Sequence, residues 1–193
     1  MRKARTLEQD KARFATAADF LKIFASEMYS LFLLAFLLTV DLETAEICFV
    51  NGLEECVHGM DSFPEWAGLW ARRSIIKHAI RLMMPAQTDT QRSPRTRLKW
   101  PATQEMNNMI RSLSALSAFE RFAFVMSILE GYSDQDCTLL LGCRRWDFEA
   151  TRARAIRSLS NYGYDRSPAY GSNAARQAIW LQHSAGINAA LVA

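Results

Sequence analysis

Apolar residues recur along the chain at steps of three and four positions, which is the period of an α-helix. No long stretch alternates between apolar and polar residues, as a half-buried strand would. The stripes predict a first helical region over residues 16–38, a second helix between an Asp41 cap and Gly59, and a third that opens at Pro64. We therefore predict an all-α protein.

Residues 85–103 interrupt this helical pattern. Pro85, Pro94 and Pro101 fall there among Gln, Thr, Ser and Arg, a composition typical of a linker. The stretch is basic and is the one clear domain boundary that the sequence indicates. The predicted division is a helical domain over residues 1–84, a linker over residues 85–103, a second helical domain over residues 104–160 and a C-terminal extension over residues 161–193.

The second domain has a pattern with a functional meaning. Its predicted helices are residues 104–113, a helix that Ser117 caps and Gly131 ends, a short helix between Ser133 and Gly142, and a last helix over residues 144–160. Ser133 and Asp136 form a pair that resembles a capping box. A short capped helix, a glycine and then a basic helix follow the order of a helix-turn-helix, whose second helix lies in the DNA major groove. An ordinary helical hairpin has the same pattern, so both interpretations stay open.

The formal net charge of +3 conceals blocks of opposite sign. Residues 28–63 contain six acids and no Lys or Arg, whereas residues 64–100 contain eight bases and two acids. The last predicted helix, residues 144–159, contains five Arg and two acids. Basic blocks of this kind are typical of surfaces that bind a polyanion, although solvated helix faces can have the same composition.

The sequence gives no indication of catalysis or of a bound cofactor. We find no nucleophile–base pair, no phosphate loop and no paired carboxylates, and the four Cys lack the spacing of zinc ligands. We expect reduced Cys, no metal, no cofactor and no enzyme activity. The longest apolar run, Met28–Val40, is shorter than the about 20 residues of a spanning helix, so we expect a core helix and no membrane span. No apolar segment directly follows the basic start, so we expect a cytoplasmic protein without a secretory signal.

Residues 119–136 resemble the start of the promoter-binding domain of the extracytoplasmic-function sigma factors of bacterial RNA polymerase. In that family Leu-Pro-x-x-x-Arg-x-x-Phe leads to Glu-Gly-x-Ser-x-x-Glu, and here Arg121-Phe-Ala-Phe124 leads to Glu130-Gly-Tyr-Ser-Asp-Gln-Asp136. Residues 139–143, Leu-Leu-Leu-Gly-Cys, are similar to the family's Leu-Leu-Gly-Ile. Arg154-Ala155 and Leu159 are similar to its closing Arg-Ala-x-x-x-Leu.

The first half of the chain has a second similarity to this family. Residues 36–46 are similar to Leu-Thr-Gly-Asp-x-x-x-Ala-Glu, and Trp66, Ala71 and Arg72 fit Trp-Leu-x-x-Ile-Ala-Arg-Asn. The resemblance covers roughly residues 15–160. It implies a two-domain all-helical protein that is neither an enzyme nor cofactor-dependent. The first domain would bind core polymerase and the melted −10 element, and the second would read the −35 element.

The resemblance implies three groups of site residues. Single-stranded DNA would meet one helix at Arg72, Arg73, Lys77, His78 and Arg81. Duplex DNA would meet the last helix at Arg144, Arg145, Asp147, Glu149, Ala150, Thr151 and Arg154. Polymerase would meet Asp41, Glu46, Ile47, Val50 and Asn51. We expect Trp66 and Trp70 to be core residues, because their spacing fits the inward stripe, and His78 to lie at the surface.

Several of these positions depart from the family pattern. Ile47, Val50 and Asn51 replace Asp, Gln and Glu, which predicts an exposed apolar patch suited to a protein contact. Asp147 and Glu149 replace Thr and Lys, and a carboxylate repels phosphate, although it accepts a hydrogen bond from cytosine. These departures favour an alternative, a sigma-like interaction protein that has lost promoter recognition.

Two further positions in the last helix of the second domain depart from the family pattern. Thr151 stands where Arg is usual, and Arg152 stands where a core Leu is usual, so its stem is expected to cover the core while its charge reaches water. Residues 174–184 read as a short apolar helix that packs back or binds a partner. Expected partners are core RNA polymerase, promoter DNA and an anti-sigma factor or another protein. A third hypothesis is a helix-turn-helix regulator that uses residues 104–193 alone.

Overall fold

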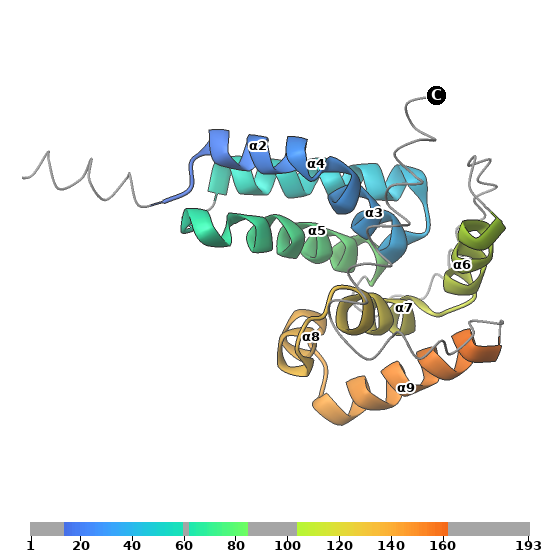
Figure 1. Ribbon diagram of the computed structural model, residues 1–193. Helices are drawn as coiled ribbons and strands as arrows, with labels where there is room; N and C mark the ends of the chain where they lie inside the picture. The colour runs from blue at the N-terminus through green and yellow to red at the C-terminus, as the bar shows by residue number, and fades with distance from the viewer. Residues whose placement is uncertain (1–13, 60–61, 85–103, 162–193) are drawn as a thin grey trace, which may run out of the picture.

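The computed structural model describes residues 14–59, 62–84 and 104–161 of the chain. Every regular element in these ranges is a helix, which confirms the all-α prediction (Figure 1). The predicted linker over residues 85–103 and the C-terminal extension beyond Asn161 lie outside the described residues.

Four helices form the N-terminal bundle: α2 (Ala17–Ser26), α3 (Met28–Thr39), α4 (Leu42–Gly59) and α5 (Ala67–Met83). A 3-10 turn over Pro64–Trp66 precedes α5, so the proline opens this element as expected. Figure 1 shows α2 and α4 side by side, with α5 packed beneath them. The α3 helix is apolar on almost every side and forms the centre of the bundle, because seven of its twelve residues are buried.

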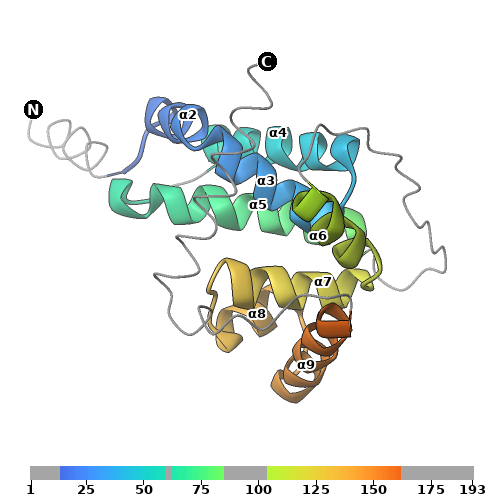
Figure 2. The same ribbon diagram turned by 45° about the vertical axis from the view of Figure 1, so that its right-hand side comes forward.

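The remaining described residues form a second group of helices. They are α6 (Gln104–Ser114), α7 (Ala118–Phe124) with its π-helical continuation Val125–Leu129, α8 (Asp134–Leu141) and α9 (Arg145–Asn161). We refer to α7, its continuation, α8 and α9 as the C-terminal helices. The α9 helix packs on α7 and α8. Figures 1 and 2 place the C-terminal helices beneath α5, where α7 contacts α3.

The helical region predicted over residues 16–38 consists of two helices, because the chain bends by 77° between α2 and α3. Glu27 leaves helical geometry at the bend, with φ −107° and ψ 17°. A continuous helix would carry the apolar residues of both segments away from the bundle. The bend instead lets α2 bury Phe20 and Phe24 while α3 crosses the bundle's centre.

The predicted caps are confirmed. The Asp41 carboxylate accepts a 2.9 Å hydrogen bond from the Thr44 amide at the start of α4. The Ser133 hydroxyl accepts one of 3.1 Å from the Asp136 amide at the start of α8. Gly142 ends α8 in the left-handed conformation, with φ 63°, where a side chain would be strained.

Within the described ranges, no single helix is long and apolar enough to cross a membrane. The two helices that reach such a length together are α2 and α3, with the 77° bend between them.

Candidate nucleic-acid interface

The first candidate surface lies on α5, where the expectation of a core Trp66 is wrong. Its side chain is 58% exposed, and Trp70 is half-buried. The buried positions of α5 are taken by Ala67, Ala71, Ser74, Ile75, Ile76 and Ala79, and α4 and α5 cross closely. At the crossing, a Cβ added to Gly52 would lie 2.9 Å from Cγ1 of Ile75. Trp66 lies outside these buried positions, and Trp70 packs at the edge of the core.

Leu69, Trp70 and Arg73 share one side of α5, and Trp66, the last residue of the 3-10 turn, precedes Leu69 by three positions. We call these four residues the α5 stripe. Leu69 is exposed, and the Arg73 guanidinium carbon lies 5.6 Å from the centre of the Trp70 ring, within range of a cation–π contact. An exposed aromatic ring such as that of Trp66, near a cation, is suited to stacking with unpaired bases.

The other predicted bases of α5 mostly have partners inside the protein. Arg72 lies 3.1 Å from Glu27 and 2.9 Å from Glu130, and Lys77 forms an ion pair with Glu55. Burial opposes ionisation of Glu55, yet hydrogen bonds from Lys77 and Ser74 hold its pKa below the ordinary value.

His78 was expected at the surface, but its side chain is mostly buried. Nε2 lies 2.9 Å from a Glu55 oxygen without the geometry of a hydrogen bond. Of the five predicted bases of α5, Arg73 and Arg81 are the two without a carboxylate partner in the described residues. The basic surface of this helix is therefore smaller than its sequence indicates.

The second candidate surface is the outer side of α9. Phe148, Thr151, Ala155 and Leu159 face the other helices and are buried. The predicted DNA contact Thr151 is thus only 1% exposed, and its hydroxyl accepts a 2.8 Å hydrogen bond from Arg154. Ile156 is exposed because it lies off the line of these four residues. Ala150 faces outward.

Of the five arginines in residues 144–157, which are Arg144 and the four of α9 that follow it, three have carboxylate partners. Arg145 lies 2.8 Å from Glu149, and Arg154 lies 3.4 Å from Glu120. Arg152 forms an ion pair with Asp134, and its guanidinium carbon lies 5.4 Å from the centre of the Phe148 ring, so its charge meets a carboxylate and a ring where water was expected. Arg144 and Arg157 have no carboxylate partner within the part of the chain that the structure describes.

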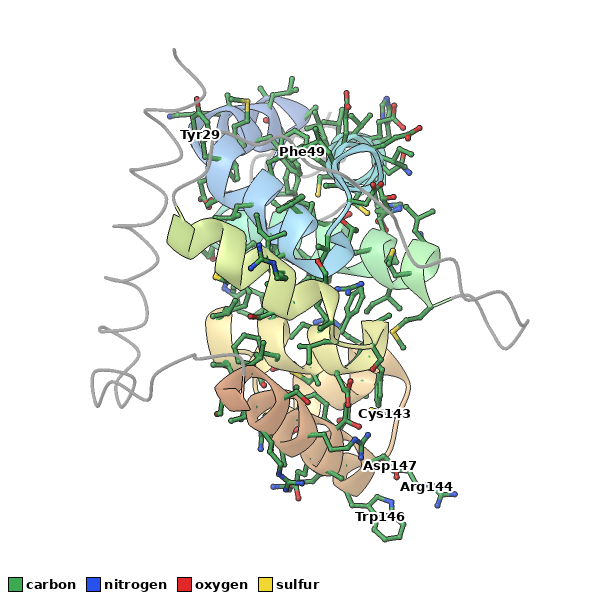
Figure 3. The ribbon with its side chains drawn as sticks, turned by 90° about the vertical axis from the view of Figure 1, so that its right-hand side faces the viewer. Tyr29, Phe49, Cys143, Arg144, Trp146 and Asp147 are labelled. Atoms are coloured by element: carbon green, nitrogen blue, oxygen red, sulfur yellow. The ribbon has the colours of Figure 1, made fainter. Side chains whose placement is uncertain are left out.

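Trp146 is a candidate contact that the sequence analysis did not single out. Its side chain is 67% exposed, and Figure 3 shows it with Arg144 at the end of the molecule, projecting away from the helices. Asp147 lies beside them. Trp146 stands two residues before Phe148 in the sequence, which puts it on the side of α9 opposite the buried residues. This spacing could have identified it as a surface residue.

The predicted polymerase contacts lie on α4. Ile47 and Val50 are 44% and 43% exposed, which confirms the apolar patch. Glu46 is exposed beside them, whereas Asn51 is half-buried. Asp41 caps α4, so its carboxylate already has a structural role.

The outward side of α4 has an exposed carboxylate at each end of an exposed apolar pair. Glu43, Ile47, Val50 and Glu54 follow at steps of four, three and four, and all four side chains are exposed. The apolar pair therefore lies between carboxylates on one side of the helix. We call Glu43, Glu46, Ile47, Val50 and Glu54 the α4 patch.

No protein-family model, curated protein or solved structure matches this chain.

Proposed function

We propose that this protein is a sigma-like transcription protein, which binds core RNA polymerase and promoter DNA to direct initiation. In this proposal the N-terminal bundle and the C-terminal helices act as two domains. The α5 stripe binds unpaired bases, and α8 and α9 form a helix-turn-helix on duplex DNA. The observation that carries the proposal is the outward position of Trp66, beside Trp70 and Arg73.

The arrangement of α8 and α9 supports the duplex-binding part. A capped short helix ends at a left-handed Gly142, and α9 follows with Arg144 and Trp146 exposed at its start. The first residues of a recognition helix are the ones that reach base edges in the major groove. An exposed Asp147 fits a cytosine amino group, which donates a hydrogen bond to a carboxylate.

Binding of a fluorescent single-stranded oligonucleotide, measured by anisotropy at low salt, tests the first surface. Trp66→Ala should weaken binding about tenfold, since one base–aromatic stack contributes about 1–3 kcal/mol. Leu82→Ala is the matched control, because Leu82 is also an exposed apolar residue of α5 but lies outside the stripe. Equal affinities of wild type and Trp66→Ala would reject the α5 stripe as a binding surface.

Assembly with purified core RNA polymerase tests the rest of the proposal. The full chain should co-elute with core enzyme at low salt and should support transcription from at least one promoter of its host. A chain that neither co-elutes nor supports transcription would reject an initiation role.

The second candidate function is a sigma-like interaction protein that does not initiate transcription. The specific observation in its favour is the internal pairing of Arg72, Lys77, Arg145 and Arg154, which leaves few cations for phosphate. The α4 patch would then be the surface that binds a protein.

Affinity purification from the host distinguishes the two functions. Recovery of polymerase subunits supports the first. A defined non-polymerase protein that is recovered by wild type and lost with Ile47→Asp supports the second. Leu21→Asp is the control, because Leu21 is an exposed apolar residue on α2, outside the α4 patch.

A further inference from the structure

One ion pair joins the N-terminal bundle to the C-terminal helices. Nη1 of Arg72 on α5 lies 2.9 Å from Oε2 of Glu130, although the two residues are 58 positions apart in the chain. Nη2 of Arg72 contacts Glu27 at 3.1 Å and the Ser30 hydroxyl at 3.2 Å. Only 6% of the Glu130 side chain is exposed. Among the described residues, Arg72 is the cation that pairs with this buried carboxylate.

In the structure the C-terminal helices pack on the N-terminal bundle, and we call this arrangement closed. It removes several polar groups from contact with water. Burial raises the pKa of Glu130 in spite of the attraction of Arg72. Arg121, which donates to the carbonyl oxygen of Leu38 across the same junction, has its pKa lowered to about 10 by burial. The buried Tyr132 hydroxyl has no hydrogen-bond partner in the described residues. Such groups oppose burial, so the hydrogen bonds, ion pairs and apolar contacts of this junction have to offset that cost.

We propose that Arg72 is a latch: it neutralises Glu130 in the closed arrangement, and its withdrawal leaves a buried unpaired carboxylate that drives the C-terminal helices away from the N-terminal bundle. Removing one partner of a buried ion pair is far more disruptive than replacing both, because the remaining charge has no compensation. Opening lets water reach Glu130 and removes that cost.

The use of this latch rests on the proposed function. Arg72 lies three positions after Leu69 of the α5 stripe, so the two are neighbours on the surface of the helix. A phosphate bound along the stripe therefore competes with Glu130 and Glu27 for the Arg72 guanidinium. A single strand of DNA whose phosphate pairs with Arg72 therefore opens the molecule, and the closed form binds such a strand less tightly. Binding and opening are reciprocally coupled, as thermodynamic linkage requires.

Small-angle X-ray scattering of the full chain, without any ligand, tests the latch itself. Arg72→Ala should increase the radius of gyration and accelerate hydrogen exchange in α3 and α7. The double variant Arg72→Ala/Glu130→Gln should return to the wild-type size, because a neutral amide needs no counter-charge. Lys77→Ala is the matched control: it breaks an ion pair with Glu55 inside the N-terminal bundle and should leave the size unchanged. A compact Arg72→Ala variant, or a double variant as expanded as the single one, overturns the proposal.

Two further measurements keep the test decisive. If circular dichroism shows that Arg72→Ala loses helix, Arg72→Gln replaces it, because Gln keeps a polar side chain but has no charge to pair with Glu130, and a compact folded Arg72→Gln whose α3 and α7 exchange as slowly as in wild type counts against the latch. A single-stranded oligonucleotide should expand the wild type but leave Arg72→Ala/Glu130→Gln compact, and a bound yet compact wild type refutes the coupling. If no oligonucleotide binds, the proposed function fails, while the ligand-free comparison still decides the latch.

Discussion

The guanidinium of Arg121 lies against the end of α3, where its Nε donates a 2.7 Å hydrogen bond to the carbonyl oxygen of Leu38. The last carbonyl groups of a helix have no partner within it, so this cation satisfies one of them and complements the negative end of the helix dipole. The same side chain donates longer bonds, of 3.4 Å, to Leu113 and Leu116. One residue thus connects α3, the end of α6 and α7.

Arg121→Ala should lower the free energy of unfolding by about 3 kcal/mol, because it leaves buried carbonyl groups without a donor. Urea denaturation followed by circular dichroism measures the change. Arg154→Ala is the control, since Arg154 is exposed and its ion pair with Glu120 contributes at most about 1 kcal/mol. Similar losses in both variants would contradict a special role of Arg121.

Gly52→Ala should destabilise the N-terminal bundle by about 1–3 kcal/mol, the usual cost of overpacking. The new methyl group would stand 2.9 Å from Cγ1 of Ile75, closer than such carbons approach. Gly59→Ala is the matched control at the end of the same helix, where a Cβ meets no atom within 4 Å. Thermal denaturation of the two variants checks the prediction, and a melting temperature of Gly52→Ala equal to that of Gly59→Ala would disprove it.

Glu55 should contribute to stability at neutral pH and lose that contribution in acid. Its pKa lies below the ordinary value of 4.5, against the effect of burial, because of hydrogen bonds from Lys77 and Ser74. The folded state then binds a proton less readily than the unfolded state, so the stabilisation is complete above the ordinary pKa and disappears as the pH falls through the lowered one. The free energy of unfolding of Glu55→Gln should therefore fall less than that of wild type between neutral pH and acid. An unchanged dependence on pH would rule this out.

Trp146→Ala should weaken binding of duplex promoter DNA about tenfold while leaving the unfolding curve unchanged, since a base-edge contact contributes about 1–3 kcal/mol and the side chain is 67% exposed. Leu139→Ala is the control, because Leu139 is equally exposed but lies on α8. Electrophoretic mobility shift at fixed salt measures both. A variant that binds duplex as tightly as wild type would exclude Trp146 from the interface.

The local features of the fold were accessible from the sequence. The helical period, the Asp41 cap and the Ser133–Asp136 cap depend on residues within three or four positions of one another, so the pattern alone predicts them. The exposed patch at Ile47 and Val50 was also predicted, from its departure from the family pattern. The bend at Glu27 was not, because it is favourable only when both helices bury their apolar sides against α4 and α5.

By itself, the sequence determined that the protein is helical, where several of its helices begin and end, and which stretches are basic or acidic. The tertiary structure decided which charges remain available and which side of α5 faces water. Arg72 meets Glu27 and Glu130 across 45 and 58 positions, and Gly52 meets Ile75 where α4 and α5 cross. Such relationships depend on how helices far apart in the chain pack together, and no local pattern contains that information.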